Sequence, residues 1–230
     1  MTRCGRSSRN SNPETNSRSF SPPLLDGGAY RFHFVVAQLA DGRQVKARLP
    51  LEAYQTIVAA TNFKQRVRKL VEYFHADRLR YAVIGTPNRL EYDQGFFVKN
   101  GDGAADLKPI AHLYKSQVYQ LADYLDIPDL IRMRPPTTDT YSLEQSQEEF
   151  YFSLPLRTLD LCLFAKNNGH PPDAIAGEVG LTSKQVRRVF EDIDAKRSAT
   201  EYLHWRPLLV EPVAEVGGCC ENGTALHDRV

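Results

Sequence analysis

The chain has 230 residues, of which 42% are apolar and 25% are charged, and its formal net charge is +1. This size supports one substantial core or two small ones, and the near-neutral balance argues against nucleic-acid and membrane-surface proteins, because those classes carry a basic excess. No segment approaches the roughly 20 apolar residues of a membrane span, and Cys4, Cys162, Cys219 and Cys220 form no CxxC spacing. We therefore expect a cytoplasmic protein in a reducing compartment.

The two ends of the chain are predicted to be disordered tails. Residues 1–23 are rich in Ser, Arg and Asn and offer almost nothing to bury, so that they cannot offset the entropy lost on ordering. Residues 214–230, AEVGGCCENGTALHDRV, are also expected to be unstructured. The remaining residues, 24–213, are predicted to form one folded domain.

The first predicted elements are a hairpin and a long helix. Residues 31–49 alternate apolar and polar side chains on both sides of Asp41-Gly42, a dipeptide that suits a tight turn, and this predicts two antiparallel strands. A helix over residues 51–77 follows Pro50. Its apolar residues recur at helical spacing and are expected to bury one face of the helix; they are Phe63, Val67, Leu70, Val71 and Phe74.

The next elements predict an α/β fold. Residues 79–86, LRYAVIGT, are continuously apolar before a turn, which is typical of a strand buried on both faces of a parallel sheet. An amphipathic helix after residue 113 is expected to stop near Pro128. We therefore predict an open, mainly parallel doubly wound sheet with an inserted antiparallel hairpin and a helical C-terminal part. Ligands bind such sheets at the carboxyl ends of the strands, which is where IGTPNRLEY begins.

A Gly-rich loop follows, in which acids and lysines alternate. Gly101 and Gly103 permit close backbone approach, while Asp102 and Asp106 supply oxygen ligands. Lysines at positions 99, 108 and 115 supply cations, and the combination suits a magnesium nucleotide. A solvated surface turn is the alternative explanation for an isolated GDG.

Taken in order, four segments resemble the ammonia-using NAD(+) synthetases: NFKQRVR, GTPNRLEYDQGFFVKNGDGAAD, KPIAHLYKSQV and RPPTTD. The likeness runs from about Leu24 to Val213, and the order and spacing of these motifs are specific. The resemblance implies an adenine nucleotide alpha-hydrolase-like fold and ATP-dependent amidation of deamido-NAD(+). The substrate carboxylate is adenylated with loss of pyrophosphate, and ammonia then displaces AMP. No protein nucleophile is needed.

The resemblance also implies roles for individual residues. Thr86, Lys115 and Thr137 match the family's ATP-binding positions, and Glu91 matches a magnesium ligand. The positions that meet deamido-NAD(+) are Arg66, Lys99, Asp106 and Lys196, although Ala195 replaces the histidine that usually precedes the last of these. Family members are homodimers, and the helix over residues 51–77 is a candidate interface.

One family motif is missing from the sequence. Members carry near their N-terminus an SGGxDS turn, whose amides cradle the ATP pyrophosphate and whose aspartate is a second magnesium ligand; nothing between Met1 and Lys64 matches it. The expectation is a truncated or mis-started reading frame, or a naturally shortened protein. Without this motif the chain alone is expected to make NAD(+) slowly and to be poorly soluble unless a dimer covers the exposed surface.

Two alternatives stay open. A non-catalytic relic would keep the synthetase-like fold for nucleotide binding or dimerisation, and the missing motif favours it. A helix-turn-helix DNA-binding protein is suggested by residues 172–193, where Gly180 and Thr182 precede a helix that carries Lys184, Arg187 and Arg188. The acids that follow directly and the near-neutral chain weigh against DNA binding.

Overall fold

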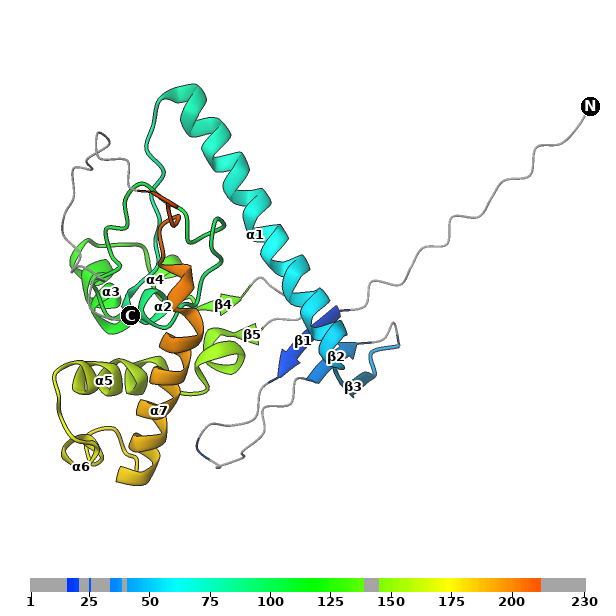
Figure 1. Cartoon of the computed structure of the whole chain (residues 1–230). Coiled ribbons are helices and arrows are strands. Elements are labelled where there is room, and N and C mark those ends of the chain that lie inside the picture. The colour runs from blue at the N-terminus through cyan, green and yellow to red at the C-terminus, as the bar shows by residue number, and fades with distance from the viewer. Residues whose placement is uncertain (1–15, 21–24, 26–33, 39–40, 139–144, 212–230) are drawn as a thin grey trace, which may run out of the picture.

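The computed structural model describes residues 16–20, 25, 34–38, 41–138 and 145–211. A three-stranded antiparallel sheet, order β1-β2-β3, lies at one end of the long helix α1 (Leu51–Leu79) (Figure 1). Its strands are β1 (Asn16–Phe20), β2 (Phe34–Gln38) and β3 (Gln44–Arg48). Phe34 pairs with Arg48 and Gln38 with Gln44, which confirms the predicted hairpin.

The strand β1 lies within the segment predicted to be a disordered tail. Its five residues pair with β2 in antiparallel register, from Asn16 opposite Gln38 to Phe20 opposite Phe34. Strand pairing is made by backbone groups, so a polar segment can add to an existing edge without an apolar face. The other residues of the predicted N-terminal tail, and all of the predicted C-terminal tail, lie outside the described residues.

The helix α1 (Leu51–Leu79) confirms the predicted helix, but its apolar face is not buried. Phe63, Leu70 and Phe74 are 67%, 69% and 62% exposed, whereas Lys69 and Ala76 are buried. The expectation of a buried stripe is therefore wrong for the described chain. Helical spacing creates an apolar stripe, but the stripe is buried only where another element packs along it, and Figure 1 shows α1 largely apart from the other helices.

The predicted buried strand is reduced to a short contact. Ile84 forms an isolated parallel bridge with Leu107, and the N–H of Gly85 donates to the Leu107 carbonyl at 2.8 Å. Val83 is buried, but Tyr81 and Ile84 are exposed. Within the described residues the sheets are antiparallel, so the open parallel sheet is not confirmed, whereas the parallel direction of this bridge agrees with it.

The remaining chain is mainly helical. After α2 (Arg89–Asp93) and α3 (Lys115–Tyr124) the chain forms several short elements and two longer helices. The longer helices, α5 (Leu156–Asn167) and α7 (Ser183–Thr200), pack against each other. The shorter elements include the antiparallel pair β4–β5 and a π-helical turn. In chain order they are α4 (Asp129–Arg132), β4 (Thr137–Thr138), β5 (Gln145–Ser146), the π-helical turn Glu148–Phe152, α5 (Leu156–Asn167), α6 (Pro172–Ile175), α7 (Ser183–Thr200) and the 3-10 turn Glu201–Leu203.

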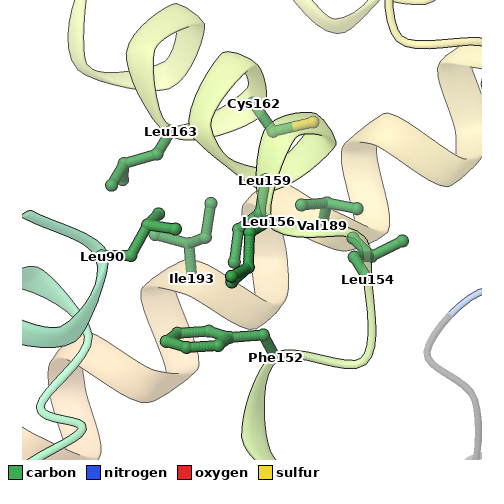
Figure 2. Packing of buried hydrophobic residues seen from close by; sticks show 9 residues of the cluster. All are labelled: Leu90, Phe152, Leu154, Leu156, Leu159, Cys162, Leu163, Val189 and Ile193. Carbon is green, nitrogen blue, oxygen red and sulfur yellow. The ribbon is translucent and has the colours of Figure 1, made fainter. Parts of the chain in front are cut away.

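The core lies among α2, the π-helical turn, α5 and α7 (Figure 2). Cys162 and Leu163 from α5 and Ile193 from α7 are fully buried. Burial raises the pKa of the Cys162 thiol to about 11, so this cysteine is a packing residue and not a nucleophile. The other members of the cluster are Leu90, Phe152, Leu154, Leu156, Leu159 and Val189.

None of the helices in the described residues has the length and apolar character needed to cross a membrane.

Candidate functional site

The first part of the candidate site is the turn between Ile84 and α2. A Cβ atom at Gly85 would lie 2.7 Å from the Cβ atom of Ala105, so only glycine allows these two segments to approach. Thr86 is exposed in this turn. Asn88 caps α2, since its Oδ1 accepts from the N–H groups of Leu90 and Glu91 at 2.9 and 3.3 Å.

Glu91 completes this cap and also reaches a distant segment. Its Oε2 accepts the backbone N–H of Asn88 at 2.8 Å, which forms a capping box. Its Oε1 accepts from Nε2 of Gln147 at 3.1 Å. The N–H of Gln147 in turn donates to the carbonyl of Pro136, the residue before Thr137. Glu91 and Thr137 are thus brought into neighbouring segments, and the Glu91 carboxylate forms no ion pair among the described residues.

The N-terminus of α3 lies beside the same turn. The N–H of Arg89 donates to the Leu113 carbonyl at 2.8 Å, two residues before Lys115. The buried carboxylate of Asp160, from α5, accepts the N–H groups of Lys115 and Ser116 at 3.2 and 2.7 Å. Asp160 therefore fixes the backbone from which the Lys115 side chain projects.

We expect Asp160→Ala to destabilise the fold by about 2–3 kcal/mol, because it removes a buried charged acceptor and leaves two helix N–H groups without their partner. Urea unfolding measures this loss. Asp77→Ala removes an exposed aspartate from α1 and serves as the matched control. Equal effects of the two substitutions would show that the Asp160 cap contributes nothing.

A hydrogen bond to the side chain of Asp102 holds the Gly-rich loop in shape. Oδ1 of Asp102 accepts the N–H of Val98 at 2.8 Å, and desolvation of the carboxylate raises the pKa of Asp102, although the residue as a whole is exposed. A Cβ atom at Gly103 would lie 2.3 Å from the Phe97 ring, so this glycine is needed for close packing. Asp102 thus helps to hold the shape of the loop.

Two of the predicted dinucleotide residues contact each other. Nε of Arg66 donates to the backbone carbonyl of Lys99 at 3.2 Å. The Lys99 ammonium donates to the carbonyls of Tyr202 and Trp205 at 2.7 and 3.2 Å. The segment that follows α7 therefore lies against the Gly-rich loop at Lys99.

Asp106 lies at the parallel bridge. Its Oδ2 accepts the N–H of Val83 at 2.7 Å, and its own N–H donates to the Val83 carbonyl at 2.9 Å. Burial and the neighbouring Asp106 carboxylate raise the pKa of Tyr73. Asp106 is otherwise exposed, and it lies beside the Gly85 turn because the next residue, Leu107, forms the parallel bridge with Ile84.

Lys196 is placed differently from the other predicted site residues. Its ammonium lies 2.7 Å from Oδ2 of Asp192, and the two side chains are only 7% and 5% exposed. It also lies over the Tyr151 ring, 4.8 Å from the centroid. In this geometry the Lys196 charge belongs to the protein interior, and its predicted contact with a substrate stays a prediction.

A separate cavity of about 510 Å³ opens beside α2. Its wall includes Arg197, which donates to both carboxylate oxygens of Asp93 at 2.6 and 2.7 Å. None of the predicted site residues lines it. The complete lining is Arg89, Tyr92, Asp93, Ala111, His112, Arg197 and His204.

Sequence reasoning missed the residues that hold the site together. Asn88 and Glu91 have the three-residue spacing of a capping box, which could have been noticed. Asp160 and Gln147 act across 44 and 56 positions of sequence and leave no local signal. Among the described residues, no group of three or more His, Cys, Asp or Glu could hold a metal ion, so a metal here would rely on few carboxylates.

Known proteins are similar to this chain over the part that contains the candidate site. The NAD synthase family model matches residues 38–201, which contain all of the predicted site residues from Arg66 to Lys196. The NH(3)-dependent NAD(+) synthetase of Rhizobium meliloti (strain 1021) is 64% identical over 192 residues, and that of Rhizobium rhizogenes (strain K84 / ATCC BAA-868) is 63% identical over 193 residues. Each alignment covers 84% of this chain and 58% of the relative. The chain thus spans less than two thirds of the length of these curated relatives.

Among solved structures, the NMN synthetase from Francisella tularensis is similar, with 26% sequence identity and a TM-score of 0.54 over 69% of this chain and 60% of the other. The matches do not favour the DNA-binding alternative. In the structure, α7 directs Val186, Val189 and Ile193 into the interior, and Arg188 donates to the carbonyl of Leu25. Because the family model covers well over half of its length, the chain belongs to the NAD synthase family.

Proposed function

We propose that the protein is an NAD(+) synthase that amidates deamido-NAD(+) with ammonia at the expense of ATP. The observation that carries this proposal is the 64% identity to an NH(3)-dependent NAD(+) synthetase over 192 residues. The contacts that join the Gly85 turn to Leu107, Leu113 and, through Gln147, to the segment before Thr137 support a shared site for two nucleotides.

In the proposed reaction a carboxylate oxygen of deamido-NAD(+) attacks the α-phosphorus of ATP, the bond to the β-phosphate oxygen breaks, and pyrophosphate leaves. Ammonia then attacks the acyl carbon, AMP departs, and the nitrogen loses a proton to give the amide. Thr86, Lys115 and Thr137 bind ATP, with Lys115 stabilising the charge that develops on the leaving group. Arg66, Lys99, Asp106 and Lys196 bind the dinucleotide.

Glu91 is the proposed magnesium ligand. Its two oxygens accept one hydrogen bond each, and carboxylate oxygens have further lone pairs, so the group can hold a metal without losing its cap. Magnesium commonly uses one or two carboxylates together with phosphate oxygens, so Glu91 need not belong to a larger cluster of acidic residues. When bound, the ion neutralises charge on the phosphates.

Three further features belong to the proposal. A cytoplasmic location fits the buried free thiol of Cys162. An open, mainly parallel doubly wound sheet fits the parallel bridge between Ile84 and Leu107. A homodimer fits the exposed apolar face of α1, which includes Phe63, Leu70 and Phe74.

If α1 is the dimer interface, Leu70→Glu should weaken self-association about tenfold or more, because it places a charge in a desolvated contact. Sedimentation velocity over a concentration series measures the change. Leu130→Glu introduces the same charge at a residue of α4 that is 90% exposed and should leave the association unchanged. An unaltered dimer with Leu70→Glu would move the interface away from this face.

The proposed activity is tested by incubating the purified chain with ATP, magnesium, ammonia and deamido-NAD(+) and measuring NAD(+) and AMP. The same assay is run on a second, longer form of the protein, which begins upstream of residue 1 and includes any SGGxDS segment that the gene encodes in frame. We expect NAD(+) and AMP in equal amounts from the extended form, and a rate at least about a hundredfold lower from the 230 residues alone, because amide donors for the departing pyrophosphate are worth that much. Absence of NAD(+) in both forms would overturn the proposal and favour a nucleotide-binding relic.

A further inference from the structure

A short segment at the end of α7 lies across the Gly-rich loop; we call residues 200–205 the C-terminal strap. The Lys99 ammonium donates to the strap carbonyls of Tyr202 and Trp205 at 2.7 and 3.2 Å. Lys99 Nζ also lies 5.8 Å from the centroid of the Tyr202 ring. An ammonium has three donors, so the strap uses most of the bonding capacity of this lysine.

The strap is anchored independently by His204. Its ring meets the edges of the Tyr92 and Phe97 rings with centroid distances of 4.7 and 5.2 Å, and those two rings stack on each other at 5.9 Å. Lys108 lies over the Tyr92 ring at 4.9 Å. Partial burial, followed by the charge of Lys108, lowers the pKa of His204.

The start of the strap also fits closely against the turn that follows α2. Gly95 has a φ of +68°, and a Cβ atom at this position would lie 2.2 Å from the Cβ atom of Thr200. The strap is thus held at three points, namely Thr200 against Gly95, His204 against the aromatic pair, and two carbonyls against Lys99. Its resting position is well defined.

Lys99 consequently has two competing uses. A dinucleotide offers anionic oxygens, and a lysine bonds an anionic acceptor more strongly than a neutral carbonyl. We propose that the C-terminal strap is autoinhibitory: it holds the Lys99 ammonium in the ligand-free protein, and an anionic group of the dinucleotide displaces the strap carbonyls when it binds. This inference rests on the proposed role of Lys99 in dinucleotide binding.

The proposal predicts opposite changes in dinucleotide affinity for substitutions at Lys99 and in the strap. Lys99→Met removes the group for which strap and ligand compete, so it should release the strap and weaken dinucleotide binding about tenfold. His204→Ala loosens the strap but leaves Lys99 in place. It should tighten binding about threefold to tenfold, because a larger fraction of the protein has a free Lys99 before the ligand arrives.

Trp205 is the single tryptophan of the chain and reports the strap directly. In the ligand-free full chain, we expect lower fluorescence anisotropy and a red-shifted emission of Trp205 in both Lys99→Met and His204→Ala. Lys184→Met, which removes an exposed lysine at the start of α7, is the matched control and should match the wild type. If both test variants keep the wild-type anisotropy and emission, the strap is not held as proposed.

Titration with deamido-NAD(+) completes the test. The wild type should show the same loss of anisotropy on binding, whereas Lys99→Met should show little further change. A wild-type signal that does not change in the titration, or a His204→Ala variant that binds more weakly than the wild type, would overturn autoinhibition and leave the strap a structural brace. A strap that is released without production of NAD(+) in the assay above would count against the proposed function and not against the strap.

Discussion

Glu91→Gln is expected to lower turnover about a hundred- to a thousandfold while changing the free energy of unfolding by less than about 1 kcal/mol. The substitution removes the negative charge of a proposed metal ligand but keeps the volume of the side chain. The capping bond from the Asn88 N–H can be kept by the amide oxygen, since that bond needs only an acceptor. The new amide nitrogen can face Gln147, whose buried Oε1 has no hydrogen-bond partner among the described residues and can accept after an amide flip.

The rate is measured in whichever form of the protein makes NAD(+), as a function of magnesium concentration. Urea unfolding of the same samples gives the stability. Glu191→Gln changes an exposed glutamate of α7 in the same way and should alter neither quantity. A Glu91→Gln enzyme with wild-type turnover at low magnesium would remove Glu91 from the metal site and leave it as a capping residue only.

Leu163→Ala should destabilise the protein by about 2–5 kcal/mol, the largest stability effect that we expect for a single aliphatic substitution. Leu163 is fully buried between α5 and its neighbours, and truncation leaves a cavity where the surrounding side chains cannot all move inward (Figure 2). The midpoint and slope of a urea unfolding curve separate this loss from a change in cooperativity.

Leu130→Ala removes the same atoms from a site that is 90% exposed and is expected to cost less than about 0.5 kcal/mol. A small effect at Leu163 would mean that the helical core relaxes around the missing side chain. Comparable effects at both positions would mean that the cluster around α5 is not the part of the molecule that controls its stability.

Local patterns predicted the elements better than their surroundings. The hairpin, α1 and α3 were predicted from alternation, helical spacing and turn residues, all of which are properties of neighbouring positions. The same spacing could not say that Phe63 and Leu70 would be exposed, because burial depends on which surfaces meet after the chain folds. Conversely, the strand β1 formed in a segment without an apolar pattern, since backbone pairing with β2 does not require one.

In the candidate site, too, some residues could be predicted from local sequence patterns and others could not. The motifs located the Gly85 turn, Glu91, Lys115 and the Gly-rich loop, and hydrogen bonds bring their segments together. The carboxylate of Asp160 and the carbonyls at Lys99 could not be predicted, because each lies far away in sequence and uses an ordinary residue or a backbone group. Resemblance to a family transfers the residues that touch ligands, but it says little about the residues that hold them in position.

The ion pair between Lys196 and Asp192 restricts which substitutions can be accepted at these two positions during evolution. Losing either member alone leaves an unpaired charge in the interior, which typically destabilises the fold by several kcal/mol. Replacing both members by apolar residues of similar size can leave the stability of the fold unchanged. A lineage therefore cannot pass from the charged pair to an apolar pair through independent single changes without an unstable intermediate. In close descendants of this protein the two positions should change together or not at all.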